Sequence, residues 1–217
     1  MYTPRAFAQT DLALLDWLFV RNPFVTLISR RDHGQPAISH LPVLYRRDAQ
    51  AVIIQAVIIE GHWARLNPQA RQPGDAVIVV QGPHAYVSPN WYPDKESAAR
   101  VPTLNYAVAH LHGRYSQITD EVEVGDLIGR TSAHFEERAG SDWLFEMQCD
   151  SHRRQLRGLV GFHFVPSRIE LTFELSQNHP AGQVAAVSDA LALQASTNSQ
   201  EVAALMRDAL RARDGTT

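Results

Sequence analysis

The sequence predicts a mainly β fold with flanking helices, an α+β arrangement built around an antiparallel barrel, and three observations lead to this fold class. About seven short segments rich in β-branched and aromatic residues follow one another, separated by turn residues. Apolar residues recur at helical spacing near both ends of the chain. Hydrophobic residues make up 45% and charged residues 20% of the 217 positions, which suits a single domain over residues 1–217.

A first helix is expected between Thr10 and Arg21. Its apolar residues recur three or four positions apart: Leu12, Leu15, Leu18 and Phe19. Thr10 or Asp11 can cap the start of this helix, and Pro23 is placed to end it.

The strands follow this helix. In chain order they are expected over residues 24–29, 36–45, 51–59, 76–81, 85–91, 106–118 and 159–175. Turns at 32–34, 46–48 and 72–75 separate the first four, so that 24–29 and 36–45 form a hairpin within a meander. A sandwich would also accommodate these strands, and the barrel is the preferred architecture.

Helical patterns return in the second half of the chain. One covers Glu121 to Arg138, and C-terminal helices are expected at about residues 183–213, where Val202, Leu205 and Met206 share one face. We expect these helices to pack outside the barrel.

Charge, cysteine content and hydropathy exclude several functional classes. The net charge of −3 gives no overall attraction to nucleic acid, and the chain has no helix-turn-helix signature. Cys149 is the single cysteine and the N-terminus lacks a secretory pattern, so a cytoplasmic location is expected. The apolar stretch from Ala51 to Ile59 is far shorter than the roughly 20 residues that a membrane helix needs.

The segment from Gly61 to Asn67 is the most informative one chemically. Glycine permits close approach of a ligand to the backbone, and His62 and Arg65 supply hydrogen-bond donors suited to a phosphate. A short helix starting near Trp63 would add its N–H groups. The alternative is an ordinary solvated turn.

Aromatic and amide side chains cluster at other strand ends. Tyr86, Trp91 and Tyr92 could stack on a flat ring or fill a core or subunit interface. Four amides could satisfy the mixed donor and acceptor edge of a flavin or a base, or could fix loops: Asn90, Asn105, Gln177 and Asn178.

Other common sites find no support. His110 and His112 would share one face of a strand, but neither an HExxH motif nor a cysteine pair accompanies them, so no metal site is predicted. Ser39 and His40 point to opposite faces of a strand and form no catalytic pair. The chain has neither GxGxxG nor a Walker loop.

Taken in order, the motifs of this chain resemble the PaiB-like family of FMN-binding negative transcriptional regulators. The similar segments are Met1–Pro4 with Phe7, His40–Pro42, Gly61-His62 with Ala64-Arg65 and Asn67-Pro68, Gly82-Pro83, Ala85–Pro89, Trp91-Tyr92, Val101–Thr103, Asn105-Tyr106 and Leu175–Asn178. They extend over nearly the whole chain.

The resemblance implies an antiparallel split barrel of the FMN-binding type, related in architecture to pyridoxamine phosphate oxidases. It implies FMN as cofactor and a homodimer with the flavin at the subunit interface, Trp91 and Asn105 coming from the partner. The implied cofactor-binding residues are His40, Leu41, Pro42, Gly61, His62, Arg65, Asn67, Trp91, Asn105, Gln177 and Asn178.

Three positions depart from the family pattern. The family carries tryptophan where Leu104 stands and basic residues where Thr172 and Glu174 stand. If a lysine normally neutralises the flavin phosphate, its loss removes a charge-assisted contact of about 1.5–3 kcal/mol. The expectation is weaker FMN binding or a different ligand.

These features leave three functions open. The first is a flavin-binding regulator that acts on transcription, with nucleic acid binding unsupported by charge or motif. The second is an FMN-dependent oxidoreductase, for which no catalytic residue can be named. Haem binding on the same barrel is the third, based on the ten histidines and on relatives of similar architecture.

Overall fold

The computed structural model describes residues 3–30, 34–48, 57–213 and 215. Its contacts group into two compact units. Unit 1 comprises residues 1–18, 81–109 and 170–217, and unit 2 comprises residues 19–80 and 110–169. Three long strands contribute residues to both units: β6 (Gly74–Val87), β7 (Thr103–Ile118) and β8 (Leu159–Glu174). The prediction of one domain over the whole chain stays a prediction.

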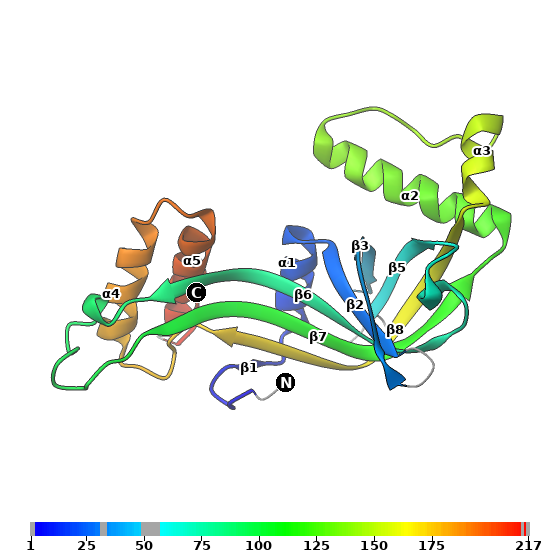
Figure 1. The fold of residues 1–217 in the computed structure, drawn as a ribbon. Coiled ribbons are helices and arrows are strands. Elements are labelled where there is room, and N and C mark those ends of the chain that lie inside the picture. Colours follow the sequence, from blue (N-terminus) through cyan, green and yellow to red (C-terminus); the bar gives the residue numbers. More distant parts are fainter. Residues whose placement is uncertain (1–2, 31–33, 49–56, 214, 216–217) are drawn as a thin grey trace. The chain divides into compact units, whose positions relative to one another are not determined.

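Unit 2 contains most of the strands of the antiparallel sheet. Besides parts of the long strands, it holds β2 (Phe24–Arg30), β3 (Pro36–Pro42), β4 (Leu44–Arg47) and β5 (Val57–Ala64). The strand order is β3-β2-β6-β7-β8-β5-β4, and β2 and β3 form the predicted hairpin, with Phe24 opposite Pro42 (Figure 1).

The sheet of unit 2 curls on itself. β3 is the first strand in this order, yet it contacts β5, which stands next to the last strand at the opposite end. A Cβ atom placed at Gly61 of β5 would lie 3.2 Å from Leu41 Cδ1 of β3. Apolar side chains at alternating strand positions fill the interior, among them Val25, Leu27, Ile59, Ile78, Leu111, Phe162 and Phe164. The predicted antiparallel barrel with flanking helices is therefore confirmed.

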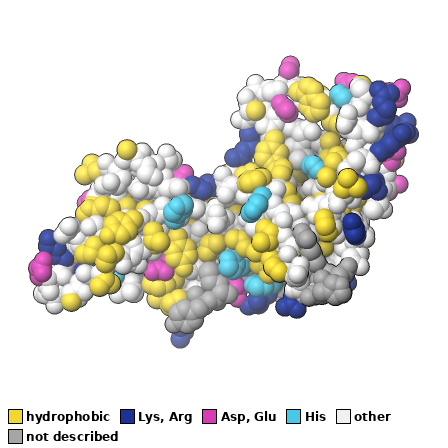
Figure 2. Space-filling model, viewed as in Figure 1, with side chains coloured by type: hydrophobic (Ala, Val, Ile, Leu, Met, Phe, Trp, Pro, Cys, Tyr) yellow, Lys and Arg dark blue, Asp and Glu magenta, His cyan; other side chains and the backbone are white. Residues whose placement is uncertain are grey.

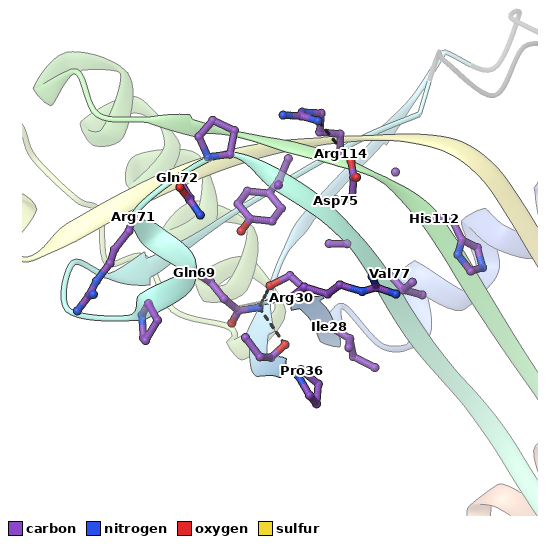
Figure 3. A pocket seen from close by; sticks show the side chains of 18 of the residues that line it. Ile28, Arg30, Pro36, Gln69, Arg71, Gln72, Asp75, Val77, His112 and Arg114 are labelled. Atoms are coloured by element: carbon purple, nitrogen blue, oxygen red, sulfur yellow. Dashed lines mark hydrogen bonds and ion pairs between the residues drawn. The ribbon is translucent and has the colours of Figure 1, made fainter. Parts of the chain in front are cut away.

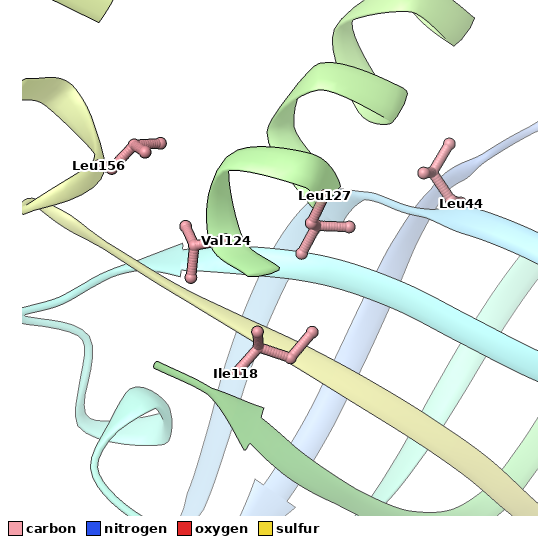
Figure 4. Packing of buried hydrophobic residues seen from close by; sticks show 5 residues of the cluster. All are labelled: Leu44, Ile118, Val124, Leu127 and Leu156. Atoms are coloured by element: carbon pink, nitrogen blue, oxygen red, sulfur yellow. The ribbon is translucent and has the colours of Figure 1, made fainter. Parts of the chain in front are cut away.

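Two helices cover the outside of part of this sheet: α2 (Glu121–Ala139) and α3 (Asp150–Leu156). Asp120 caps α2 because its Oδ1 accepts from the N–H groups of Val122 and Glu123, and Gly140 ends it with φ 71°. The apolar face of α2 packs with α3 and the sheet in a cluster formed by Leu44, Ile118, Val124, Leu127 and Leu156 (Figure 4).

Unit 1 combines the remaining parts of β6, β7 and β8 with a short strand, most of the N-terminal helix and the C-terminal helices. β1 (Ala8–Gln9) pairs with β8, Ala8 lying opposite Thr172. The predicted C-terminal helices are α4 (Ala181–Ala192) and α5 (Thr197–Arg213), which pack side by side (Figure 1). The N-terminal helix α1 spans Leu12–Arg21, as expected, with Leu15 and Leu18 fully buried.

Several boundaries differ from the prediction. The strands expected at 76–81 and 85–91 are one strand, β6, followed by the 3-10 helix η4 (Pro89–Trp91). Gly82 makes the continuous strand possible, because a Cβ there would lie 2.8 Å from the carbonyl oxygen of Ala107. The strand expected at 36–45 breaks at Val43, where the chain leaves β2 as a partner and β4 begins pairing with β5.

The turn expected at 46–48 is not found at Arg46 and Arg47, because these two residues belong to β4. Residues 32–33 of the first predicted turn and 51–56 of the predicted strand 51–59 lie outside the described residues. In the described part of the chain, no helix has the length and apolar character needed to cross a bilayer.

Candidate functional site

Gly61 lies in the middle of β5, opposite Phe162 of β8. A Cβ atom at this position would lie 2.8 Å from the Phe162 ring, so the core itself requires glycine here. Trp63 is 3% exposed and packs against Phe162, with ring centroids 4.3 Å apart. No helix starts at Trp63, because β5 continues to Ala64 and the next short helix is η3 (Pro68–Ala70), so the N–H groups that a helix there would have offered are not available.

His62 points to the opposite face of β5 from Gly61 and Trp63. Its Nδ1 atom is buried and has no hydrogen-bond partner among the described residues. Burial lowers the pKa of His62 below its ordinary value. Since buried polar atoms are normally paired, this nitrogen is a candidate for contact with a ligand or an ordered water, as is the buried Nε1 of Trp63 on the inner face.

Arg65 begins the bend that follows β5. Its backbone N–H donates to Gly158 O at 2.7 Å. The guanidinium donates from Nε to Arg157 O at 2.7 Å and from Nη2 to Leu159 O at 3.1 Å. These bonds fix the direction of the side chain and leave its positive charge without an acidic partner among the described residues.

Asn67 connects this bend to β3. Its Oδ1 accepts from the Gln69 N–H at 3.0 Å, which caps η3, and its Nδ2 donates to Ser39 Oγ at 3.1 Å. Gln69 in turn accepts from Ser39 and donates to Ser29 Oγ at 2.8 Å. Asn67 therefore holds the Arg65 bend against the inner face of β3.

The predicted residues of β3 divide between the two faces of that strand. Leu41 is buried, so only its backbone is available to a ligand. His40 is exposed on the outer face, where its Nδ1 lies 3.0 Å from Thr26 Oγ1. Phe24 and Ile38 share this outer face and are more than half exposed, which provides an apolar surface beside His40. Pro42 ends the strand.

Glu60, a residue that sequence reasoning missed, is the most buried carboxylate near this site. Arg130 of α2 binds its two oxygens at 2.7 and 3.2 Å, while Arg46 and His163 approach to 3.0 and 3.1 Å. Burial raises the pKa of Glu60, but the hydrogen bond and charge of Arg130, together with Arg46 and His163, lower it overall. This ion cluster attaches α2 to β5, two residues from His62.

A cavity with a volume of about 1170 Å³ lies within unit 2, at the ends of β2, β6 and β7. Figure 3 shows Arg30 extending toward Val77 and Arg114 beside Asp75, to which it is 3.5 Å away. Buried Gln69 and Tyr115 also contribute to its lining. None of the eleven predicted residues lines this cavity.

A smaller cavity of about 330 Å³ lies within unit 1 and brings two of the predicted residues together, Asn105 and Asn178. At its base the Tyr92 hydroxyl lies 3.2 Å from Ser176 Oγ, which donates to Asn105 Oδ1 at 3.1 Å. Asn105 is fully buried, and among the residues that the structure describes its Nδ2 reaches only the sulfur of Met206, at 3.3 Å. Ser176 has φ 60°, a left-handed conformation that is costly for serine.

The other two predicted residues of unit 1, Trp91 and Gln177, line neither cavity. Gln177 braces the end of β8, because its Oε1 accepts from the Leu175 N–H at 2.6 Å and its Nε2 donates to Phe173 O at 2.5 Å. Trp91 closes η4 and is partly buried.

One wall of the smaller cavity is a charged group that sequence reasoning also missed. Arg100 binds both oxygens of Asp94, at 2.9 and 2.6 Å, and its Nη1 lies 2.9 Å from His179 Nδ1. The Arg100 guanidinium also lies 5.0 Å from the centre of the Tyr92 ring. Nothing in the sequence indicated that Arg100 lies beside His179, a residue 79 positions away.

Comparison with known proteins agrees with this architecture. The chain is 31% identical over 218 residues to the protease synthase and sporulation protein PAI 2 of Bacillus subtilis (strain 168), covering 97% of this chain and 99% of that protein. Among solved structures, the FAD and heme binding protein from Mycobacterium smegmatis superposes with a TM-score of 0.54 at 17% identity, over 77% of this chain and 73% of the other.

The flavocytochrome Anf3 from Azotobacter vinelandii gives a TM-score of 0.52 at 12% identity, over 79% of this chain and 72% of that one. At such identities the two structures show a shared fold only. The family model described as "Putative FMN-binding domain" matches residues 1–168. This match, with the relation to PAI 2 along the full length, shows that the chain belongs to the PaiB-like family of FMN-binding split-barrel proteins.

Proposed function

We propose that this FMN-binding protein holds its flavin at the junction of β3 and the Arg65 bend. The supporting observation is that the unpaired, buried Nδ1 of His62 and the fixed guanidinium of Arg65 lie three residues apart at the end of β5. A phosphate needs such donors, and a flavin ring needs an apolar surface such as the outer face of β3. The residues present therefore fit the cofactor.

Each predicted residue has a definite part in this proposal. Arg65 and His62 bind the phosphate end, and Asn67 keeps the Arg65 bend in place. His40 contacts the ring, while Leu41, Pro42 and Gly61 act through their backbone, because their side chains are buried, cyclic or absent. When bound, FMN would supply redox chemistry, and the chain would orient it and exclude water.

The remaining four residues belong to unit 1: Trp91, Asn105, Gln177 and Asn178. We propose that the protein is a homodimer and that Trp91 and Asn178 reach the flavin carried by the partner subunit. Asn105 is fully buried, so it would act indirectly, through its hydrogen bond with Ser176. Gln177 would act indirectly, by holding the loop that carries Asn178. Light scattering should give twice the mass of the chain, and a monomer at micromolar concentration would contradict this part.

The absorbance spectrum and one matched pair of variants test the flavin site. Purified protein should show, or take up with added FMN, the visible bands of oxidised flavin. Arg65→Ala should weaken FMN binding at least tenfold, since one charge-assisted contact contributes about 1.5–3 kcal/mol. Arg71→Ala, six residues further along and exposed, is the control and should bind FMN normally.

Two results would overturn this proposal. One is equal FMN affinity of Arg65→Ala and Arg71→Ala, both with native circular dichroism, since Arg65 would then serve only the backbone of 157–159. The other is a haem absorption band in place of a flavin spectrum.

We further propose that the protein acts in the cytoplasm and influences transcription through a partner protein rather than by binding DNA itself. On the face drawn in Figure 2, basic side chains beside α2 and α3 have acidic ones among them, and the net charge of the chain is −3. This face therefore shows no continuous basic surface, which binding to the DNA backbone requires. Gel shifts at low salt should therefore show no complex with promoter DNA, and a salt-sensitive complex would reverse this conclusion.

A further inference from the structure

The smaller cavity contains a carboxylate without a positive partner, that of Glu174 at the end of β8. Its hydrogen-bond partner is the Tyr106 hydroxyl, and no basic group among the described residues neutralises it. Burial raises the pKa of Glu174, against the smaller effect of the Tyr106 hydrogen bond. A half-buried carboxylate of this kind is stabilised by any cation that enters the cavity.

Arg100, another charged residue of the lining, is already paired. Arg100 is bound bidentately by Asp94, so the pair contributes no net charge. Burial and the neighbouring Arg100 lower the pKa of His179, against the smaller opposite effect of Asp94, which favours the neutral form of its ring. Glu174 is therefore the acidic group of this lining that has no basic partner among the described residues.

The size and lining of the cavity indicate what kind of cation fits. Its 330 Å³ would hold about ten water molecules at about 30 Å³ each, which is more than a bare ion fills. No group of three or more His, Cys, Asp or Glu side chains suited to a metal occurs in the described part of the chain. Ala98, Ala99 and Val101 add an apolar wall beside the polar base.

The cavity is also built rather than incidental. Asn105, Ser176 and Tyr92 are each at least 97% buried, and they form its polar base. Asn105 Nδ2 meets only a thioether, a weak acceptor, so this amide keeps hydrogen-bonding capacity for a ligand. Ala99 and Ser176, the two described non-glycine residues with positive φ, both line this cavity.

We propose that this cavity is a binding site for a small organic ammonium ion, with Glu174 as its counter-ion. The ammonium group would donate to the Glu174 carboxylate, and a short alkyl or ring body would lie against Ala98, Ala99 and Val101. Thr103 and Ser176 offer hydroxyl oxygens for the remaining N–H groups. This assignment depends on the cavity within unit 1 and goes beyond flavin binding.

Calorimetric titration with n-butylammonium chloride tests the proposal, on the full chain with and without saturating FMN. Sodium butyrate and butan-1-ol have the same alkyl body with a negative or no charge, and sodium chloride controls for ionic strength. The wild type should bind butylammonium and none of the other three. Glu174→Gln, which keeps the size and the link to Tyr106, should weaken binding at least tenfold.

Glu123→Gln removes an equal charge from the exposed surface of α2 and should leave butylammonium affinity unchanged. The proposal is overturned if the wild type binds no butylammonium, if butyrate or butanol binds as well, or if Glu174→Gln binds with wild-type affinity. The flavin spectrum recorded on the same samples reports separately on FMN, so a failure of flavin binding is not confused with a failure here.

Discussion

Glu60 shows how a single side chain can attach a helix to a sheet. It is 1% exposed, and Arg130 of α2, Arg46 of β4 and His163 of β8 all reach it. A buried carboxylate is tolerated only when it is paired in this way, and removing its charge leaves Arg130 with less compensation.

Glu60→Gln should therefore lower the free energy of unfolding by about 1–3 kcal/mol. Because Arg130 is partly exposed to water, which screens its charge, we expect a loss at the lower end of that range. The folded-state pKa of Glu60 is lowered from 4.5, so its contribution is complete above that pH and disappears as pH falls through the folded value. Urea denaturation from pH 3 to pH 7 should show the difference between wild type and variant shrinking at the acid end. A constant difference over this range would refute the assignment.

His62 should give stability a second dependence on pH. Burial lowers its pKa from 6.5, so below that value the unfolded chain takes up a proton that the folded chain refuses. Stability should consequently fall as pH drops from about 7 toward the folded pKa, and His62→Gln should remove this part of the decline. Parallel denaturation curves at pH 5.5 and 7.5 measure it, and an unchanged decline in His62→Gln would count against a buried neutral ring.

At the scale of elements, the pairing of β7 with β8 depends on one glycine. A Cβ atom at Gly113 would lie 2.3 Å from Val165 O and 2.8 Å from Pro166 Cα, both of them backbone atoms that cannot move aside cheaply. Gly129 in α2 has open space where its Cβ would stand. These two glycines form a matched pair in unit 2.

Gly113→Ala should cost about 1–3 kcal/mol or more by overpacking two strands. Gly129→Ala should raise the free energy of unfolding by about 0.5–1 kcal/mol, because alanine is the better helix former and reduces the conformational entropy of the unfolded chain. Thermal melts of the two variants should move in opposite directions. Shifts of the same sign would mean that the β7–β8 approach is looser than described.

The elements that sequence could predict are those whose pattern is local. The spacing of Leu15 and Leu18 predicted α1, and the β-rich run 24–29 before a turn predicted the hairpin. The pattern could not show that 76–81 and 85–91 are one strand, since Gly82-Pro83 reads locally as a break. What preserves β6 there is the close approach of Ala107, a residue 25 positions away.

The site shows the same division. The segments that bear predicted residues were found from their composition and resemblance, and Asn105 and Asn178 do meet at one cavity. The packing role of Gly61 and the ion cluster of Glu60 were not visible, because Phe162 and Arg130 come from distant parts of the chain. A strand glycine beneath an aromatic ring and one beside a ligand look identical in sequence.

At the scale of the whole molecule, cofactor and fold should be linked. FMN that binds only the folded chain adds RT ln(1 + [L]/Kd) to its stability, about 2.7 kcal/mol at a hundredfold excess over Kd. Scanning calorimetry with increasing FMN should raise Tm steadily, and Arg65→Ala should blunt the rise. A Tm insensitive to FMN would contradict binding to the folded state.

The division of the chain between the units has a consequence during synthesis. Unit 1 is assembled from three stretches of sequence, the last of them residues 170–217, whereas unit 2 needs nothing beyond residue 169. A ribosome that makes the chain from its N-terminus therefore releases every part of unit 2 before the final strand end and helices of unit 1 have emerged. Growing chains should therefore pass through a stage in which unit 2 is complete while the part of β7 in unit 1 still lacks residues 170–174 of β8 as its partner.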